Sequence, residues 1–102
     1  MGEFVRVAKS GEVPNGQMKA FDVKGQRVAV ARVGANFYGF GDVCTHAQCS
    51  LADGTLEGTT VTCACHGSQF DVRSGAVLAP PAREPVASHR VRVQEEEIQV
   101  EV

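Results

Sequence analysis

The chemically reactive residues of this sequence lie in two short segments, CTHAQC at 44–49 and CACH at 63–66. Each segment holds two cysteines and one histidine, and all four cysteines of the chain are found in them. Inside a reducing cell, clustered cysteines more often bind a metal or take part in redox chemistry than form a structural framework. The two segments therefore predict a metal site or a redox site.

The spacing within each segment decides which side chains can meet. Cys44 and His46 are two positions apart, so in an extended segment both side chains can point the same way. Cys63 and His66 are three positions apart, which suits a tight turn. Sixteen residues separate His46 from Cys63, enough for a turn and a return. Two such loops side by side would present two thiolates and two imidazoles to one site.

Two other arrangements use the same residues. Zinc accepts two cysteines and two histidines in a tetrahedral site. Its usual spacings begin with a cysteine pair and end with a histidine pair, whereas each segment here supplies one of each kind. Two disulfides would use all four cysteines but leave both histidines without a role. The residue types alone leave both arrangements open.

The composition is that of one small globular domain. The chain has 102 residues, 43% of them hydrophobic and 22% charged, and its formal net charge is −2. Such a weak net charge gives no electrostatic reason to expect a nucleic acid partner. No apolar run approaches the roughly 18 residues that cross a bilayer, and the first residues, MGEFVRVAKS, lack the apolar core of a signal peptide. We therefore expect a cytoplasmic protein that does not bind a membrane.

The rest of the sequence predicts a β scaffold. Short segments that alternate apolar and polar residues, or are rich in β-branched and aromatic residues, are typical of strands. These segments are 3–7, 18–23, 27–33, 36–40, 59–63, 68–72, 88–93 and 97–102. Turns rich in glycine or acidic residues separate them, and no helical stripe exceeds two turns. The sequence predicts an all-β fold, an antiparallel sandwich or small barrel.

Residues 42–83 differ from their flanks because they hold every cysteine and two of the three histidines. We interpret this range as a subdomain of two metal-binding loops inserted into a single domain that covers residues 1–102. The third histidine, His89, lies outside any ligand spacing, so it is expected to be an ordinary surface or edge-strand residue.

The loop pattern resembles that of the Rieske iron–sulfur proteins. CTH at 44–46, a gap of sixteen residues and CACHGS at 63–68 are similar to their Cys-x-His, a gap of about this length, and Cys-x-x-His. FYGFGDVCTHAQCSLADGTLEG is also like the approach to the first loop in soluble Rieske ferredoxins, and SGAVLAPPAREPV is like the proline-bearing segment that covers the cluster. The resemblance is strong over residues 36–86 and looser, as a β framework, in the flanks.

The resemblance implies one [2Fe–2S] cluster with an asymmetric ligand set. Cys44 and Cys63 would bind one iron, and His46 and His66 the other. With two thiolates, two sulfides and two ferric ions the oxidised core is formally neutral, so it accepts an electron more readily than a core with four thiolates. In this family the imidazole edges lie near the surface, so the two histidines are also the expected electron port.

The resemblance also gives the two remaining cysteines a role. In respiratory and photosynthetic Rieske proteins, the residues at the places of Cys49 and Cys65 form a disulfide that ties the two loops together. Many ferredoxins that serve oxygenases have neither cysteine, so this chain departs from their pattern. We expect the disulfide, and a pair of small buried thiols that pack the loops is the alternative.

Two neighbours of the cluster are expected to influence its reduction potential. Ser68 matches a serine that donates a hydrogen bond to a cluster sulfur in high-potential Rieske proteins, and Phe70 stands where those proteins have a tyrosine donor. Such hydrogen bonds stabilise the reduced state. One donor kept and one lost predicts a potential in the lower or middle part of the roughly −150 to +300 mV Rieske range.

Nothing else in the sequence predicts chemistry on a substrate, so we expect an electron carrier and not an enzyme. The resemblance implies a soluble, monomeric ferredoxin that carries electrons from a flavin-dependent reductase to the terminal oxygenase of a ring-hydroxylating dioxygenase system for aromatic hydrocarbons. One alternative is the small Rieske-type subunit of an assimilatory nitrite reductase, some of which lack the ligands. Another is the Rieske subunit of a cytochrome complex, which Phe70 and the expected lack of a membrane anchor argue against.

Overall fold

The computed structural model describes residues 2–45 and 49–102, and the strands of this part form three antiparallel sheets. The first sheet, in the order β1–β11–β10, contains β1 (Phe4–Lys9), β11 (Glu97–Glu101) and β10 (Val91–Gln94). The second, in the order β2–β3–β4–β9, contains β2 (Met18–Val23), β3 (Gln26–Val33), β4 (Asn36–Gly41) and β9 (Ser88–His89). The third, in the order β5–β6–β7–β8, contains β5 (Thr55–Glu57), β6 (Thr60–Thr62), β7 (Gln69–Asp71) and β8 (Val77–Ala79). The predicted all-β antiparallel fold is confirmed.

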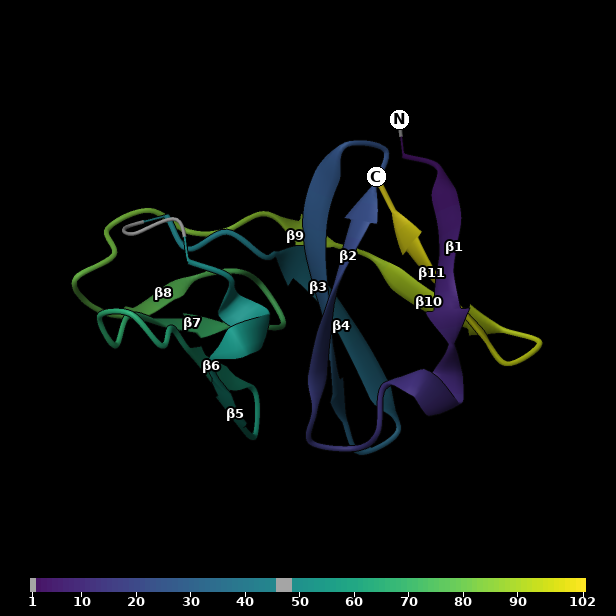
Figure 1. Cartoon of the computed structure of the whole chain (residues 1–102), viewed down its shortest axis with the longest axis horizontal. Helices are drawn as coiled ribbons and strands as arrows, with labels where there is room; N and C mark the ends of the chain where they lie inside the picture. The colour runs from purple at the N-terminus through teal and green to yellow at the C-terminus, as the bar shows by residue number, and fades with distance from the viewer. Residues whose placement is uncertain (1, 46–48) are drawn as a thin grey trace.

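The third sheet lies to one side of the other two (Figure 1). The chain leaves the second sheet at the end of β4 and returns to it in β9, which pairs with β4 itself through Gly39–His89 and Phe40–Ser88. The Gly41 N–H also donates to the Ala87 carbonyl at 2.9 Å. The segment between β4 and β9 therefore starts and ends at neighbouring strands, as expected of an insertion into a β framework.

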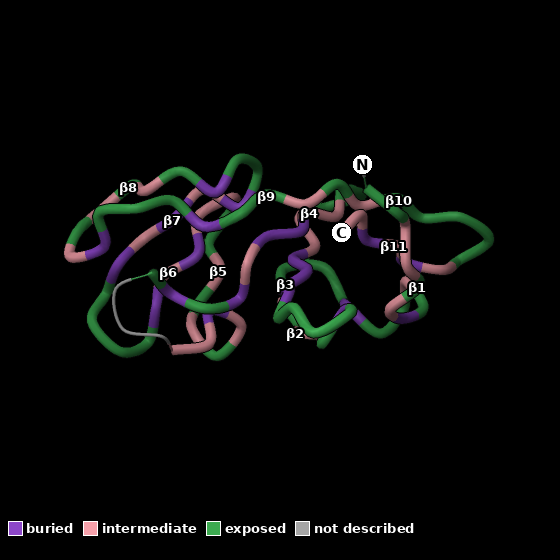
Figure 2. The backbone as a smooth tube through the Cα atoms, turned by 90° about the horizontal axis from the view of Figure 1, so that it is seen from above, coloured by how far each residue is buried: buried purple, intermediate pink, exposed green. Residues whose placement is uncertain are grey.

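Strand β3 contributes to two buried cores because its two faces alternate along the strand. Val28 and Val30 join Ile98 and other residues of the first two sheets in one core. Ala29 and Ala31, on the opposite face, join a second core that contains residues of the third sheet. The other members of this second core are Phe40, Cys44, Leu51, Val61, Cys63, Phe70, Val72, Ala82 and Val86. Figure 2 shows the burial along this strand. The third sheet thus shares its core with the framework.

The last hairpin has a two-residue turn between β10 and β11. Glu95 and Glu96 both have positive φ angles, 52° and 65°, as in the turn that suits the right-handed twist of paired strands. Across this hairpin Val93 pairs with Ile98. Ile98 is buried because β11 lies in the middle of its sheet, whereas Val93 is exposed because β10 is at the sheet edge.

Three strand predictions need correction. Strands β5 and β8 lie where a turn and a loop were expected, because their neighbours in the sequence are the glycines of ADGTLEG and the glycine and prolines of SGAVLAPP, which favour turns. The predicted strand 88–93 is divided into β9 and β10, which belong to different sheets. The only helices in the described part of the chain are the three-residue 3-10 turns η1 (Ser10–Glu12) and η2 (Leu51–Asp53). None of the described helices is long and apolar enough to cross a membrane.

Candidate metal centre

The first predicted loop is a hairpin that begins directly after β4. Val43 and Ser50 form a β-bridge, and the Cys44 N–H donates to the Cys49 carbonyl at 2.9 Å. The side chain of Cys44 is buried in the second core. His46, a predicted ligand, lies outside the described residues. The loop therefore holds one candidate thiolate at its inner end.

The second predicted loop connects β6 to β7 and is closed in the same manner. The Cys63 N–H donates to the Ser68 carbonyl at 2.8 Å, and the Gly67 N–H donates to the Cys63 carbonyl at 3.1 Å. Gly67 has a φ of 78°, a left-handed conformation that glycine adopts without steric cost. Cys63 is buried while His66 is exposed. The turn thus presents a thiol inward and an imidazole toward solvent.

A third segment, between β8 and β9, contacts both loops. The Ala82 N–H donates to Ser68 Oγ at 3.0 Å, and Thr45 Oγ donates to the Glu84 carbonyl at 2.7 Å. This segment contains a cis peptide bond between Pro80 and Pro81. The proline-bearing segment is therefore bonded to the second loop at one point and to the first loop at another.

The two loops are also joined covalently, because Cys49 and Cys65 form a disulfide. The Sγ atoms of Cys49, Cys63 and Cys65 all lie within 4.8 Å of one another. Two of these sulfurs belong to the disulfide, so only Cys63 in this group can act as a thiolate ligand. Cys44 and Cys63 are the two described cysteines outside the disulfide, and both are buried.

The residues present fit a cluster with two kinds of ligand. Two buried thiols from opposite loops can bind an iron away from water, and an exposed imidazole can bind a second iron nearer the surface. Ser68 and Phe70, the predicted neighbours of the cluster, are both fully buried in this region. Ser68 Oγ accepts one hydrogen bond, from Ala82, and its own O–H is still able to donate to an acceptor such as sulfur.

Sequence reasoning missed two residues that hold these loops. Asp42 is a buried carboxylate at the start of the first loop, and Thr45 links that loop to the proline-bearing segment. An acidic residue placed directly between an apolar strand and a buried cysteine could have indicated a role for Asp42, since a buried carboxylate needs hydrogen-bond donors. No signal in the sequence indicates the Thr45 contact, because its partner is far along the chain.

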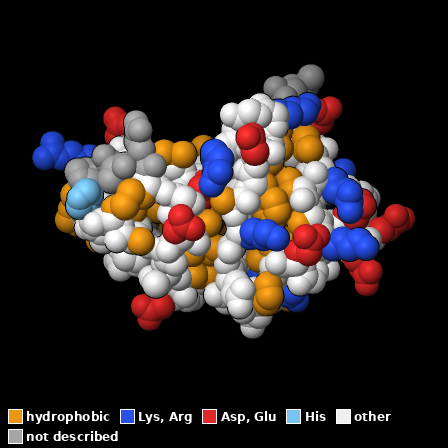
Figure 3. Space-filling model, in the orientation of Figure 1, with side chains coloured by type: hydrophobic (Ala, Val, Ile, Leu, Met, Phe, Trp, Pro, Cys, Tyr) orange, Lys and Arg blue, Asp and Glu red, His pale blue; other side chains and the backbone are white. Residues whose placement is uncertain are grey.

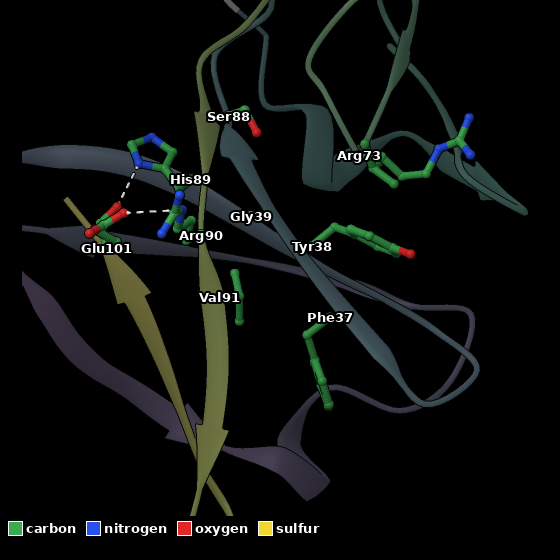
Figure 4. A pocket seen from close by; sticks show the side chains of 10 residues that line it. Phe37, Tyr38, Gly39, Arg73, Ser88, His89, Arg90, Val91 and Glu101 are labelled. Carbon is green, nitrogen blue, oxygen red and sulfur yellow. Dashed lines mark hydrogen bonds and ion pairs between the residues drawn. The ribbon is translucent and has the colours of Figure 1, made fainter. Parts of the chain in front are cut away.

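A cavity of about 420 Å³ lies away from these loops, between β4, the start of β10 and the turn after β7 (Figure 4). Phe37, Tyr38, Arg73 and His89 are among its lining residues, and none of the predicted ligands lines it. His89 lies in the edge strand β9, as expected, and its Nδ1 is 2.9 Å from the Glu101 carbonyl oxygen. The cavity is therefore not part of the candidate metal centre.

Comparison with known proteins identifies the family. The family of the Rieske [2Fe–2S] domain matches residues 3–90. The chain belongs to this family. It is 33% identical over 99 residues to the biphenyl dioxygenase ferredoxin subunit of Pseudomonas sp. (strain KKS102), a match that covers 96% of this chain and 91% of that protein. The cofactor of this Rieske domain is accordingly a [2Fe–2S] cluster.

Solved structures agree with this assignment. The ferredoxin of carbazole 1,9a-dioxygenase from Nocardioides aromaticivorans IC177 has a TM-score of 0.92 and 37% identity, with 95% of each chain covered. A chain in the complex of reduced oxygenase and oxidised ferredoxin in carbazole 1,9a-dioxygenase has a TM-score of 0.90 and 34% identity, with 95% of this chain and 91% of that chain covered. A protein from Mycobacterium tuberculosis described as a "putative NADH-dependent nitrite reductase small subunit" has a TM-score of 0.90 but only 20% identity, so this likeness shows a shared fold alone.

Proposed function

We propose that this Rieske protein is the ferredoxin component of a ring-hydroxylating oxygenase system. It carries one electron at a time from a flavin-dependent reductase to a terminal oxygenase, as a monomer in the cytoplasm. The observation that carries the proposal is the match over nearly the whole chain to ferredoxins of aromatic dioxygenase systems, one of them in complex with its oxygenase.

We assign the cluster ligands as Cys44 and Cys63 for one iron and His46 and His66 for the other. The burial of both thiols and the exposure of the His66 imidazole support this assignment. The [2Fe–2S] cluster supplies the one-electron redox couple, and neutral imidazoles raise its potential relative to four thiolates. The chain's own residues keep water from the two thiolates and hold the loops together through the Cys49–Cys65 disulfide.

The exposed imidazole gives the proposed route for the electron. The side chains of Cys44 and Cys63 are enclosed by the second core, so a partner protein cannot approach them closely. His66 lies at the surface of the second loop, where a partner can reach its ring edge. Charged side chains are more numerous over the β1, β10 and β11 side of the face in Figure 3 than over the β5–β8 side. We therefore place the docking of both redox partners at the second loop, around His66.

Reconstitution of the electron-transfer chain tests this function. The purified protein should be red-brown, give the electron spin resonance signal of a histidine-ligated cluster when reduced, and support turnover of an aromatic-ring oxygenase supplied with a flavin-dependent reductase. His66→Ala should lose this signal and the turnover. His89→Ala is the matched control, because His89 lies in β9 and hydrogen-bonds to the Glu101 carbonyl, away from both loops. A colourless wild-type protein with bound zinc would overturn the cluster assignment, and a signal without turnover would overturn the carrier role.

A further inference from the structure

The buried carboxylate of Asp42 accepts three hydrogen bonds, which come from two parts of the chain. Its side chain is only 1% exposed. Ser50 Oγ donates to Oδ2 at 2.7 Å, and the Arg27 guanidinium donates to the same oxygen at 3.2 Å. The Ala52 N–H donates to Oδ1 at 3.0 Å. One side chain thus connects the start of the first loop, its end and the framework strand β3.

The backbone of Asp42 makes the same connections. Its N–H donates to the Arg27 carbonyl at 3.1 Å, and its carbonyl accepts the Leu51 N–H at 2.7 Å. Beyond this point, in the described part of the loop, the Val43–Ser50 bridge and the bond from the Cys44 N–H to the Cys49 carbonyl join its two sides. Thr45 and the Cys49–Cys65 disulfide tie it to the proline-bearing segment and to the second loop. Asp42 is therefore the residue through which the start of this loop is bonded to strand β3.

The side chains of Asp42 and Cys44 also point to the same side of the loop. Both side chains are buried, whereas Val43 between them is 43% exposed. Residues two apart in an extended segment point to the same side, so this pattern places the carboxylate and the thiol on the inner side of the loop. A change in the position of Asp42 would move Cys44 with it, since a single residue separates them.

The chemistry of the site explains why an acid is suitable here. Ser50 O–H, Ala52 N–H and the Arg27 guanidinium are all donors, and a carboxylate is the side chain that offers acceptors on both of its oxygens. An apolar residue of similar size would leave these donors unsatisfied, and each buried donor without an acceptor destabilises the folded protein. Arg27 is 52% exposed and can turn to water, so Ser50 and Ala52 are the donors that depend most on Asp42.

We propose that Asp42 is a positioning residue for the [2Fe–2S] cluster: its carboxylate fixes both ends of the first loop, and so the place of the Cys44 thiolate. This inference rests on the ligand set given under the proposed function. Residues that orient metal ligands through hydrogen bonds typically change metal affinity by about 10–100-fold when they are replaced.

The test compares Asp42→Asn with Asp53→Asn. Asp53 belongs to η2, shortly after the same loop, and is exposed, so its replacement removes the same charge without removing a buried acceptor. Asparagine at position 42 keeps the shape but turns one acceptor into a donor that faces other donors. We expect Asp42→Asn to release its iron to a chelator about 10-fold faster than the wild type. We also expect its reduced protein to give a displaced or broadened electron spin resonance signal, whereas Asp53→Asn should match the wild type in both measurements.

Ser50 provides a second test that keeps the carboxylate, in case Asp42→Asn does not fold. Ser50→Ala removes one donor to Asp42, and Ser50→Thr keeps the hydroxyl. The alanine variant should release iron faster than the wild type, and the threonine variant should be closer to the wild type.

Two outcomes would overturn the inference, and they are distinguishable. If Asp42→Asn, or Ser50→Ala where Asp42→Asn does not fold, melts at a lower temperature but keeps the wild-type signal and iron-release rate, Asp42 only supports the fold. If the wild type itself forms no cluster, the proposed ligand set fails and this inference fails with it.

Discussion

Cys44 and Cys63 occupy matching positions in two separate hairpins. Each backbone N–H donates to the carbonyl across its loop, to Cys49 at 2.9 Å and to Ser68 at 2.8 Å. Both side chains are buried in the same core. The two residues whose carbonyls accept these hydrogen bonds differ in what their side chains bind. The Cys49 side chain forms a disulfide with Cys65, whereas Ser68 Oγ accepts the Ala82 N–H. Two loops of the same design therefore present the two proposed thiolate ligands, and different side-chain bonds hold each loop in place.

Removal of the disulfide should weaken both the fold and the hold on the cluster. In the double variant Cys49→Ser, Cys65→Ser the two loops are no longer joined. The disulfide spans 16 residues, and a cross-link that closes a loop of about 15 residues stabilises the folded state by about 3 kcal/mol in the chain-entropy account. Thermal unfolding and the rate of iron release to a chelator measure the two effects. We expect a lower melting temperature and faster release.

A reductant gives the control for the disulfide. A thiol reductant that opens the bond should lower the melting temperature of the wild type toward that of the double variant, while the variant itself should not respond. Equal melting temperatures of wild type and variant without reductant would show that the bond does not stabilise the folded protein.

Ser68→Ala should lower the reduction potential and destabilise the fold. The change leaves the buried Ala82 N–H without its acceptor, at a cost of about 1–3 kcal/mol. It also removes the O–H that we expect to donate to a cluster sulfur, and loss of such a bond disfavours the reduced state. Ser74→Ala is the matched control, because Ser74 Oγ also accepts a backbone N–H, from Ala76 at 3.3 Å, but is exposed. A Ser68→Ala protein with an unchanged potential would contradict the role of Ser68 as a donor to the cluster.

The framework could be predicted from the sequence because its strands are long enough to show a pattern. Strands β2, β3 and β4 have six to eight residues and alternate or concentrate apolar side chains. The two short outer strands of the third sheet could not be predicted in this way. They are stabilised by pairing with β6 and β7, which no local pattern reveals.

In the candidate site, too, the features with a local sequence pattern could be predicted and the long-range contacts could not. The proposed ligands were predictable because they lie close together in sequence with a spacing that few sites share. The contact from Thr45 to Glu84 joins residues distant in sequence and depends on how the inserted segment folds back, whereas the contact from Arg27 to Asp42 continues the pairing of β3 with β4. Such contacts require the structure.

The turn after β7 should make stability depend on pH in the acid range. The Arg73 guanidinium donates to both carboxylate oxygens of Asp71, at 3.1 and 2.9 Å, and lowers the pKa of Asp71 from its ordinary value. Because the pKa of Asp71 is lower in the folded state than in the unfolded state, the ion pair stabilises the folded protein at pH values above the unfolded-state pKa. This contribution is lost as the pH falls through the folded-state pKa. Chemical unfolding of the wild type and Arg73→Met at a series of pH values measures this difference.

We expect Arg73→Met to be less stable than the wild type at neutral pH, with the difference vanishing once Asp71 is protonated. Arg83→Met removes a cation from another exposed position and is the control for charge alone. A difference between Arg73→Met and the wild type that persisted undiminished in strong acid would exclude the ion pair as its cause.

Phe70→Tyr tests how the surroundings of the cluster set its potential. Phe70 is fully buried in the same core as Cys44 and Cys63, so a hydroxyl on its ring would need an acceptor inside this core, such as a ligand sulfur. A hydroxyl without a partner costs about 1–3 kcal/mol of stability, whereas one that donates to a ligand sulfur stabilises the reduced cluster and raises the potential. Phe40→Tyr adds the same hydroxyl to the same core from β4 and is the matched control. We expect the midpoint potential to rise in Phe70→Tyr alone. An equal rise in both variants would show a general effect of core polarity, and no rise in either would remove Phe70 as the reason for a lower potential.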